Sequence, residues 1–182
     1  MTDAEHPEAL ERIGILGSRS QKSRTFEWSP SGENIATINL FGNLSIWDVS
    51  TERKLREVSL LETELFCLAW SQDSRRIALG SDAGTIVYDV DDLHKVVHGD
   101  HSGPVVAVAW CLKDNLLATG SVDKTLRLRD GLTGETRAIM VGHDAPITGL
   151  SWARDGEYLA SASLDGTLRL WTRSGELGTV SK

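Results

Sequence analysis

Several features of common protein classes are missing from this sequence of 182 residues. No apolar run approaches the roughly 18 residues that a membrane-spanning helix needs, and the first eight residues are acidic and polar, unlike a secretory signal. Only two cysteines occur, Cys67 and Cys111, and both fall on strands predicted to be buried, where cysteine acts as a small apolar residue. These absences predict a soluble cytoplasmic protein without membrane contact.

Basic charge is in the minority. Lysine and arginine total 19 against 26 acidic residues, which gives a formal net charge of −7. An acidic surface repels phosphate backbones, so nucleic acid is not an expected partner. Short basic clusters at 19–24 and 53–56 are interpreted as solvated loop charges.

Helical periodicity is lacking except over 4–12, which we interpret as part of a frayed terminus. What stands out instead is tryptophan, with six residues in the chain. Four of them share one local frame, an apolar residue two positions earlier, and are separated by 42, 40 and 42 residues: Trp28, Trp70, Trp110 and Trp152.

A second frame repeats downstream of each of these tryptophans. It ends in Trp47-Asp48 in the first copy, and its last aromatic slot recurs at intervals of 41, 41 and 42 residues, occupied in turn by Trp47, Tyr88, Arg129 and Trp171. A period near 40–45 residues that ends in Trp-Asp is typical of β-propeller blades. Two independent frames agreeing over four copies make chance an unconvincing explanation.

Within one copy the pattern is strand, turn, strand, turn, strand. Residues 146–152 alternate apolar with small or polar positions, 153–157 form a turn, and 158–163 form a second strand. Asp165-Gly166 predicts a tight hairpin before the strand 167–171. Residues 176–180 are a weak fourth strand, because Gly178 lies inside it. Small residues such as Ala36, Ala78 and Ala118 in the second strands suit close stacking of sheets.

On these residues the chain resembles the WD40 repeat family over roughly 10–180. The best match runs from Gly142-His143-Asp144 to Trp171, and the first two copies are degenerate. The resemblance implies an all-β fold made of four β-propeller blades, each a four-stranded antiparallel sheet. We expect the following parts: 1–9 as a disordered tail, 10–17 as an outer closing strand, 22–60 as blade 1, 64–98 as blade 2, 104–141 as blade 3 and 146–180 as blade 4.

The resemblance also implies a structural hydrogen-bond network in each well-formed blade. It joins a loop histidine, a second-strand Ser or Thr, a turn Asp and a third-strand Trp, so that buried polar groups find partners. The first copy keeps none of these convincingly, so we expect blades 1 and 2 to be less rigid. The matching positions are His143, Ser161, Asp165 and Trp171 in the fourth copy, His101, Thr119 and Asp123 in the third, and Asp82 alone in the second.

A serine, a histidine and an aspartate together also suggest a catalytic triad. We reject that hypothesis because the set serves to satisfy buried groups and no Gly-x-Ser-x-Gly motif is present. Metal binding is not expected either: His94 and His98 would lie about 13 Å apart on a strand at about 3.3 Å per residue. Residues 17–23 lack the glycine before the lysine of a phosphate loop. No catalytic residue, metal or cofactor is predicted.

The remaining candidate for function is the surface. In WD40-like proteins partners commonly dock on loops and tight turns, which predicts a non-catalytic scaffold with a protein or peptide partner of unknown identity. The alternative is a regulatory sensor module from a larger WD-repeat signalling protein with an effector domain. An ordinary turn role is at least as plausible for each candidate partner-binding residue: Ser81, Val122, Leu164, Ser102, Asp144 and Ala145.

Four blades leave the ring open. WD-type rings typically close with about seven or eight blades by family resemblance, and an open half-ring exposes apolar faces. Residues 10–17 read as a strand that completes a last blade, here blade 4 of the same chain or of another copy. Three possibilities therefore stay open: a homodimer that closes an eight-bladed ring, a longer parent protein, or a four-bladed monomer.

Overall fold

The computed structural model describes residues 16, 22–60, 63–92, 94–99 and 101–177. The predicted tail 1–9 and nearly all of the predicted closing strand 10–17 lie outside the described residues. Every regular element within the described ranges is a β-strand. The fold is therefore all-β, as predicted.

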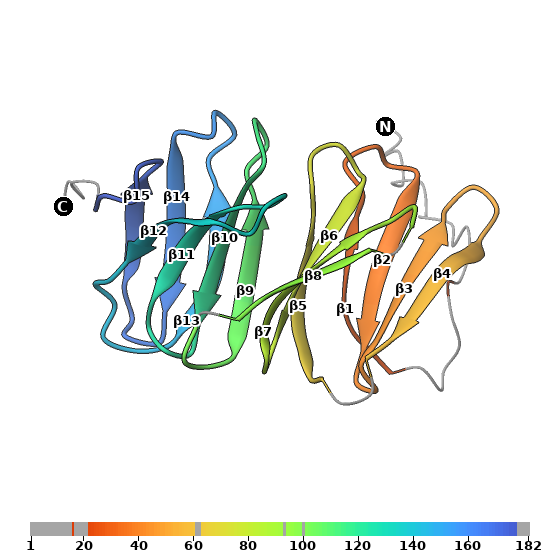
Figure 1. Ribbon diagram of the computed structural model, residues 1–182, viewed down its shortest axis with the longest axis horizontal. Helices are drawn as coiled ribbons and strands as arrows, with labels where there is room; N and C mark the ends of the chain where they lie inside the picture. Colours follow the sequence, from red (N-terminus) through yellow and green to blue (C-terminus); the bar gives the residue numbers. More distant parts are fainter. Residues whose placement is uncertain (1–15, 17–21, 61–62, 93, 100, 178–182) are drawn as a thin grey trace, which may run out of the picture.

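The strands form separate antiparallel sheets that stand in chain order across the molecule (Figure 1). Each sheet is a simple meander in which neighbouring strands in the sequence pair with one another. We call these sheets blades 1 to 4. Their strands are β1 (Ser23–Trp28), β2 (Asn34–Asn39), β3 (Asn43–Asp48) and β4 (Arg53–Ser59); β5 (Leu65–Trp70), β6 (Arg76–Ser81), β7 (Gly84–Asp89) and β8 (Lys95–His98); β9 (Val105–Trp110), β10 (Leu116–Ser121), β11 (Leu126–Asp130) and β12 (Thr136–Met140); β13 (Ile147–Trp152), β14 (Tyr158–Ser163) and β15 (Leu168–Thr172).

Blade 4 has three described strands rather than four. Leu177 forms an isolated antiparallel bridge with Trp171, at the position where a fourth strand over 176–180 was predicted to begin. Residues 178–180 lie outside the described residues.

The turn between the second and third strands is a three-residue hairpin loop in blades 3 and 4. In blade 4 the amide of Ser163 donates to the carbonyl of Thr167, and Gly166 between them has φ +80°. That left-handed conformation suits glycine because it has no Cβ. Lys124 occupies the equivalent place in blade 3 with φ +73°.

The core lies between the blades. Ala36, Ala78 and Ala118 in the second strands are completely buried, and small residues there let the next sheet approach. A Cβ added to Gly120 would lie 2.6 Å from Cγ2 of Ile147 in blade 4. This close approach is what the small residues of the second strands predicted.

The first-strand tryptophan is buried at all three joints between blades and is hydrogen-bonded to the blade before it at two of them. The Trp70 indole Nε1–H donates to the Glu27 carbonyl across the first joint, and Trp152 Nε1–H donates to the Ala109 carbonyl across the third, both at 3.1 Å. Trp110 is buried at the second joint, but its Nε1 has no hydrogen-bond partner among the described residues. The regular spacing of these tryptophans in the sequence therefore corresponds to a packing contact that recurs between neighbouring sheets.

Candidate functional site

A row of hydrogen bonds crosses blade 4 from its third strand to its entry loop. The Trp171 indole Nε1–H on β15 donates to the Ser161 hydroxyl on β14 at 2.8 Å. Ser161 Oγ lies 2.7 Å from Nε2 of His143, on the loop before β13. Nδ1 of His143 lies 2.8 Å from the carboxylate of Asp165, in the β14–β15 turn. The structure thus brings together all four residues that the family resemblance implied for this blade.

The direction of this row follows from its two ends. The carboxylate of Asp165 accepts the hydroxyl of Thr167 at 2.7 Å and the amide N–H of Asp144 at 3.0 Å. These hydrogen bonds, the one from the Thr167 hydroxyl foremost, hold the pKa of Asp165 well below its usual range, so the carboxylate is charged. Because the carboxylate can only accept, Nδ1 of His143 is the donor to Asp165.

Blade 3 contains the same row without its tryptophan. His101 Nδ1 lies 2.9 Å from Asp123, and its Nε2 lies 2.9 Å from the Thr119 hydroxyl. Burial acts to raise the pKa of Asp123, but hydrogen bonds led by those from the Thr125 hydroxyl and amide lower it to about 2. Burial also lowers the pKa of His101 below its ordinary value. Arg129 fills the tryptophan slot, and its Nη1 donates to the Thr136 hydroxyl at 3.1 Å.

The Ser161–His143–Asp165 set is enclosed. Ser161 and His143 are both buried, and the serine hydroxyl is bonded on both sides, to the Trp171 indole and to the imidazole. A nucleophile needs an accessible hydroxyl with room for a substrate carbonyl beside it. This geometry instead ties the entry loop of the blade to its turn and third strand.

Blade 2 departs from the prediction by one residue. Its β6–β7 turn has only Asp82 and Ala83 between the paired residues Ser81 and Gly84. The Asp82 amide donates to the carbonyl of Glu64, as the Val122 amide does to the residue before β9. The backbone of Asp82 therefore takes the place of Val122, and its carboxylate accepts the amide N–H of Glu64 at 3.0 Å instead of meeting a histidine.

The same one-residue shift moves Ser81 into the interior. Ser81 is fully buried, and its hydroxyl donates to the Gly84 carbonyl at 2.8 Å. It corresponds to Ser121 and Ser163, whose hydroxyls accept the amide N–H of the aspartate in the turn that follows. The prediction of Ser81 as a partner-binding surface residue is therefore wrong, and Asp82 and Ala83 are the exposed residues of that turn.

Blade 1 retains half of the row, which the sequence analysis missed. The Trp47 indole Nε1–H donates to the Thr37 hydroxyl at 3.2 Å. The signal was present in the sequence, because Thr37 precedes Trp47 by ten residues and Ser161 precedes Trp171 by ten. Phe41 stands in the turn where blades 3 and 4 have aspartate.

Equivalent turns present exposed side chains on one edge of the molecule, at the ends of the second strands. The amides of Leu40, Val122 and Leu164 each donate to the carbonyl of the residue before the first strand of the same blade, at 3.0–3.2 Å. Val122 is 40% exposed and Leu164 is 70% exposed, and Leu40 and Phe41 project from the same turn of blade 1. We call these four exposed residues the turn face. Sequence reasoning missed Leu40 and Phe41.

The remaining predicted surface residues lie beside these turns. Ser102 and Asp144 are exposed, and their amides donate to Asp123 and Asp165 respectively. Ala145 is half-buried, and its carbonyl accepts the hydroxyl of Ser163 at 2.9 Å.

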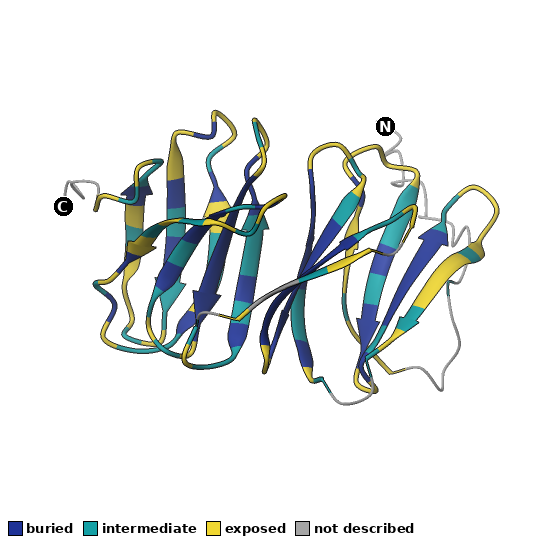
Figure 2. Ribbon diagram, viewed as in Figure 1, coloured by how far each residue is buried: buried dark blue, intermediate teal, exposed yellow. Residues whose placement is uncertain are grey.

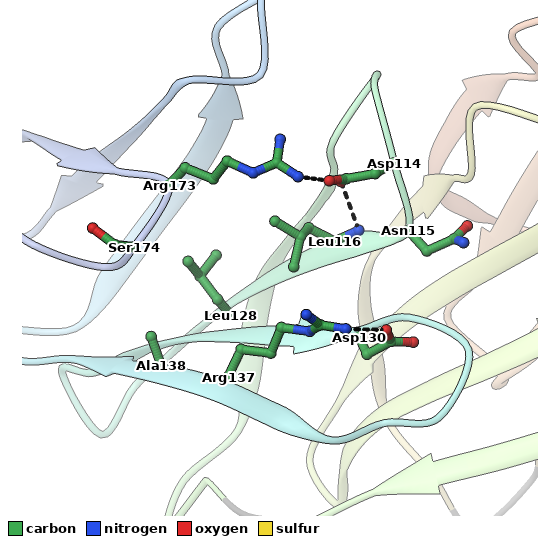
Figure 3. A pocket seen from close by; sticks show the side chains of 9 residues that line it. All are labelled: Asp114, Asn115, Leu116, Leu128, Asp130, Arg137, Ala138, Arg173 and Ser174. Atoms are coloured by element: carbon green, nitrogen blue, oxygen red, sulfur yellow. Dashed lines mark hydrogen bonds and ion pairs between the residues drawn. The ribbon is translucent and has the colours of Figure 1, made fainter.

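A pocket of about 400 Å³ opens between blades 3 and 4 at the opposite ends of the strands (Figure 3). Arg173 pairs with Asp114, and Arg137 Nη2 lies 2.6 Å from the carboxylate of Asp130. Figure 3 shows the two arginines reaching toward the pocket from different segments, each facing its aspartate. Because each charge is matched, the pocket has no excess charge with which to capture an ion.

Among the residues that the structure describes, no three His, Cys, Asp or Glu side chains come together as a possible metal site. No helix in that part of the chain has the length and apolarity needed to cross a bilayer.

Comparison with known proteins places this geometry among repeat proteins. Residues 8–149 match the family described as "WDR19 first beta-propeller", and residues 134–172 match "WD domain, G-beta repeat". The actin-related protein 2/3 complex subunit 1A of Arabidopsis thaliana is 26% identical over 126 residues, which cover 65% of this chain and 33% of that protein. The mouse (Mus musculus) F-box-like/WD repeat-containing protein TBL1X is 36% identical over 136 residues, which cover 65% and 26%.

Solved structures show the same fold. A chain described as "Structure of U3-55K" superposes with a TM-score of 0.81 at 17% identity, over 91% of this chain and 53% of that one. The chain thus spans about a third or less of these two protein relatives and about half of that solved chain.

Proposed function

We propose, from the premise that the chain belongs to the WD-repeat β-propeller family, that it is a non-catalytic scaffold that binds a protein or peptide on its turn face. The observation that supports this most strongly is the set of exposed apolar side chains on hydrogen-bonded turns: Leu40, Phe41, Val122 and Leu164.

Rigid presentation favours binding at these positions. Apolar side chains exposed on a soluble surface are candidate contacts for a partner. Ordering a loop on binding costs free energy, and a loop already fixed by hydrogen bonds avoids that cost. The networks around His101 and His143 fix the turns that present Val122 and Leu164. These two residues are therefore the expected anchors.

The enclosed Ser161 supports a role without catalysis, and neither a cofactor nor nucleic acid nor a membrane forms part of it. We place the protein in the cytoplasm. One relative is named as a subunit of the actin-related protein 2/3 complex, which agrees with a role inside an assembly. A regulatory module of a larger WD-repeat protein is the alternative, supported by the partial coverage of that relative. A second copy of the chain is a further proposed partner.

A random peptide library displayed on phage tests the turn face. Peptides selected on the wild-type chain are synthesised, and their affinities are measured by fluorescence anisotropy against a Val122→Asp/Leu164→Asp double variant. We expect an affinity loss of roughly 10-fold or more, since charges then replace the apolar anchors.

The matched control is Leu112→Asp/Leu132→Asp, which alters two exposed leucines in turns at the opposite ends of the strands. Unchanged binding to this control is expected. Equal binding to both double variants, or a failure to enrich any peptide, would refute the turn face as the site.

A further inference from the structure

We infer that two copies of this chain join head to tail, the free face of blade 1 in each copy packing on the free face of blade 4 in the other, so that an eight-bladed ring closes. This inference rests on the proposal that a second copy is a partner, and it assigns the surface and the residues. Its basis is a comparison of the two end faces with the three contacts between neighbouring blades inside the chain.

The free face of blade 1 has the composition of a buried joint. Trp70, Trp110 and Trp152 are each at most 9% exposed because the preceding blade covers them, whereas the equivalent Trp28 is 50% exposed. Phe26, two residues earlier, is also exposed, although Leu68 at its equivalent position is buried. β1 is accordingly exposed along most of its length (Figure 2).

The free face of blade 4 shows the complementary pattern. Leu126 and Leu128 on β11 are at most 1% exposed because blade 4 packs on them. Their equivalents on β15, Leu168 and Leu170, are 63% and 38% exposed. Tyr158 on β14 is likewise exposed where Leu116 is buried. This face therefore has the composition of an internal joint.

The hydrogen bond between a tryptophan indole and a backbone carbonyl, seen at two internal joints, has a possible donor on blade 1 and a possible acceptor on blade 4. At two internal joints the tryptophan indole donates to the carbonyl of the residue that precedes the tryptophan of the blade before, Glu27 or Ala109. By the same rule, Trp28 Nε1–H meets the carbonyl of Ser151, which precedes Trp152 and is exposed. Ser23 is a departure, since the equivalent positions in the other blades are apolar.

Within one copy of this chain the two end faces cannot meet. Blades 1 and 4 lie at opposite ends of the row of sheets, with blades 2 and 3 between them (Figure 1). The two faces differ from each other, so the contact is heterologous, and such contacts form closed rings when the rotation permits. Two copies satisfy all four end faces, and about eight blades fall within the range in which propellers close.

Solution mass measured by size-exclusion chromatography with light scattering, over a concentration series, tests the ring. We expect the wild type to be a dimer, and expect Trp28→Asp or Leu168→Asp/Leu170→Asp to raise the dissociation constant roughly 30-fold or more. These side chains are exposed in the single chain, so far-UV circular dichroism and the urea midpoint of dilute protein should stay unchanged. Leu112→Asp/Leu132→Asp, away from both faces, should remain dimeric.

A mixture of the two end-face variants sharpens the test. Each molecule then retains one intact face, the two intact faces are complementary, and a single joint forms only in the mixture. A wild type that stays monomeric at every concentration, or that forms polydisperse aggregates, overturns the ring, as does a dimer that persists in both variants. Peptide binding by the monomeric Trp28→Asp variant separates the two proposals, because the turn face can bind peptide even when the ring is wrong.

Discussion

Ser161 is the residue on which the blade 4 network depends, and replacing it with alanine is the most direct test of that network. Its hydroxyl accepts from the Trp171 indole N–H and is hydrogen-bonded to His143 Nε2 at 2.7 Å, and the residue is 1% exposed. Ser161→Ala removes one oxygen and keeps the Cβ, so packing changes little. Both partners remain buried and lose their hydrogen bond.

The expected cost follows from those two stranded groups. Leaving a buried donor or acceptor without a partner costs about 1–3 kcal/mol, so two of them predict a loss of about 2–6 kcal/mol. Thr37 in blade 1 provides a matched comparison, because its hydroxyl has the Trp47 indole as its partner, at 3.2 Å. Thr37→Val leaves only the indole N–H without its partner and should cost about 1–3 kcal/mol.

Urea unfolding followed by circular dichroism gives the free energies, and a loss of about 3 kcal/mol corresponds to roughly 6–12 °C in melting temperature for a chain of this size. Hydrogen exchange of the Trp171 indole N–H, followed by NMR, localises the effect: it should accelerate in Ser161→Ala and stay slow in Thr37→Val. The reasoning fails if Ser161→Ala costs no more than Thr37→Val, or if the indole exchange rate is unchanged.

Two further outcomes follow from the geometry. Because burial lowers the pKa of folded His101, the unfolded chain binds a proton more readily, so stability should decline as pH falls below about 6.5. It should decline again between about pH 4 and pH 2 as Asp123 becomes protonated. Urea midpoints measured from pH 8 to 2 would contradict this if they stayed flat. Gly80→Ala places a Cβ 2.4 Å from the Cys67 sulfur and 2.5 Å from the Val105 carbonyl oxygen and should cost about 1–3 kcal/mol, whereas Gly149→Ala, 4.0 Å from its nearest neighbour, should cost little; equal melting temperatures would refute the close approach of blades 2 and 3.

Much of this architecture was predictable because the joint between blades repeats a bulky, buried tryptophan at a fixed interval. Trp28, Trp70, Trp110 and Trp152 each end a first strand, as their spacing predicted. The ten-residue separation of a Ser or Thr from the third-strand slot also gives the hydrogen-bonded pairs of blades 1 and 4. Both signals are local and come from side chains that must be buried.

The position of a deletion was not predictable in the same way. Trp70 precedes Tyr88 by 18 residues, whereas Trp110 precedes Arg129 by 19, so blade 2 is visibly one residue short. Counting back from Tyr88 makes Asp82 the network aspartate, and counting forward from Trp70 does not. Only the strand pairing decides, and it places the missing residue in the turn after Ser81.

The hydrogen-bond networks determine which part of the turn face should bind a partner most tightly. Val122 and Leu164 sit on turns that are tied to their entry loops through His101 and His143, whereas the turn carrying Leu40 has no such aspartate link. Since a fixed turn loses less entropy on binding, the affinity for a partner should concentrate on blades 3 and 4. In a two-copy ring those blades recur on opposite sides, with the less constrained blades 1 and 2 between them. A partner with two linked copies of its binding segment would then bind more tightly than one copy in proportion to how well its linker spans the ring.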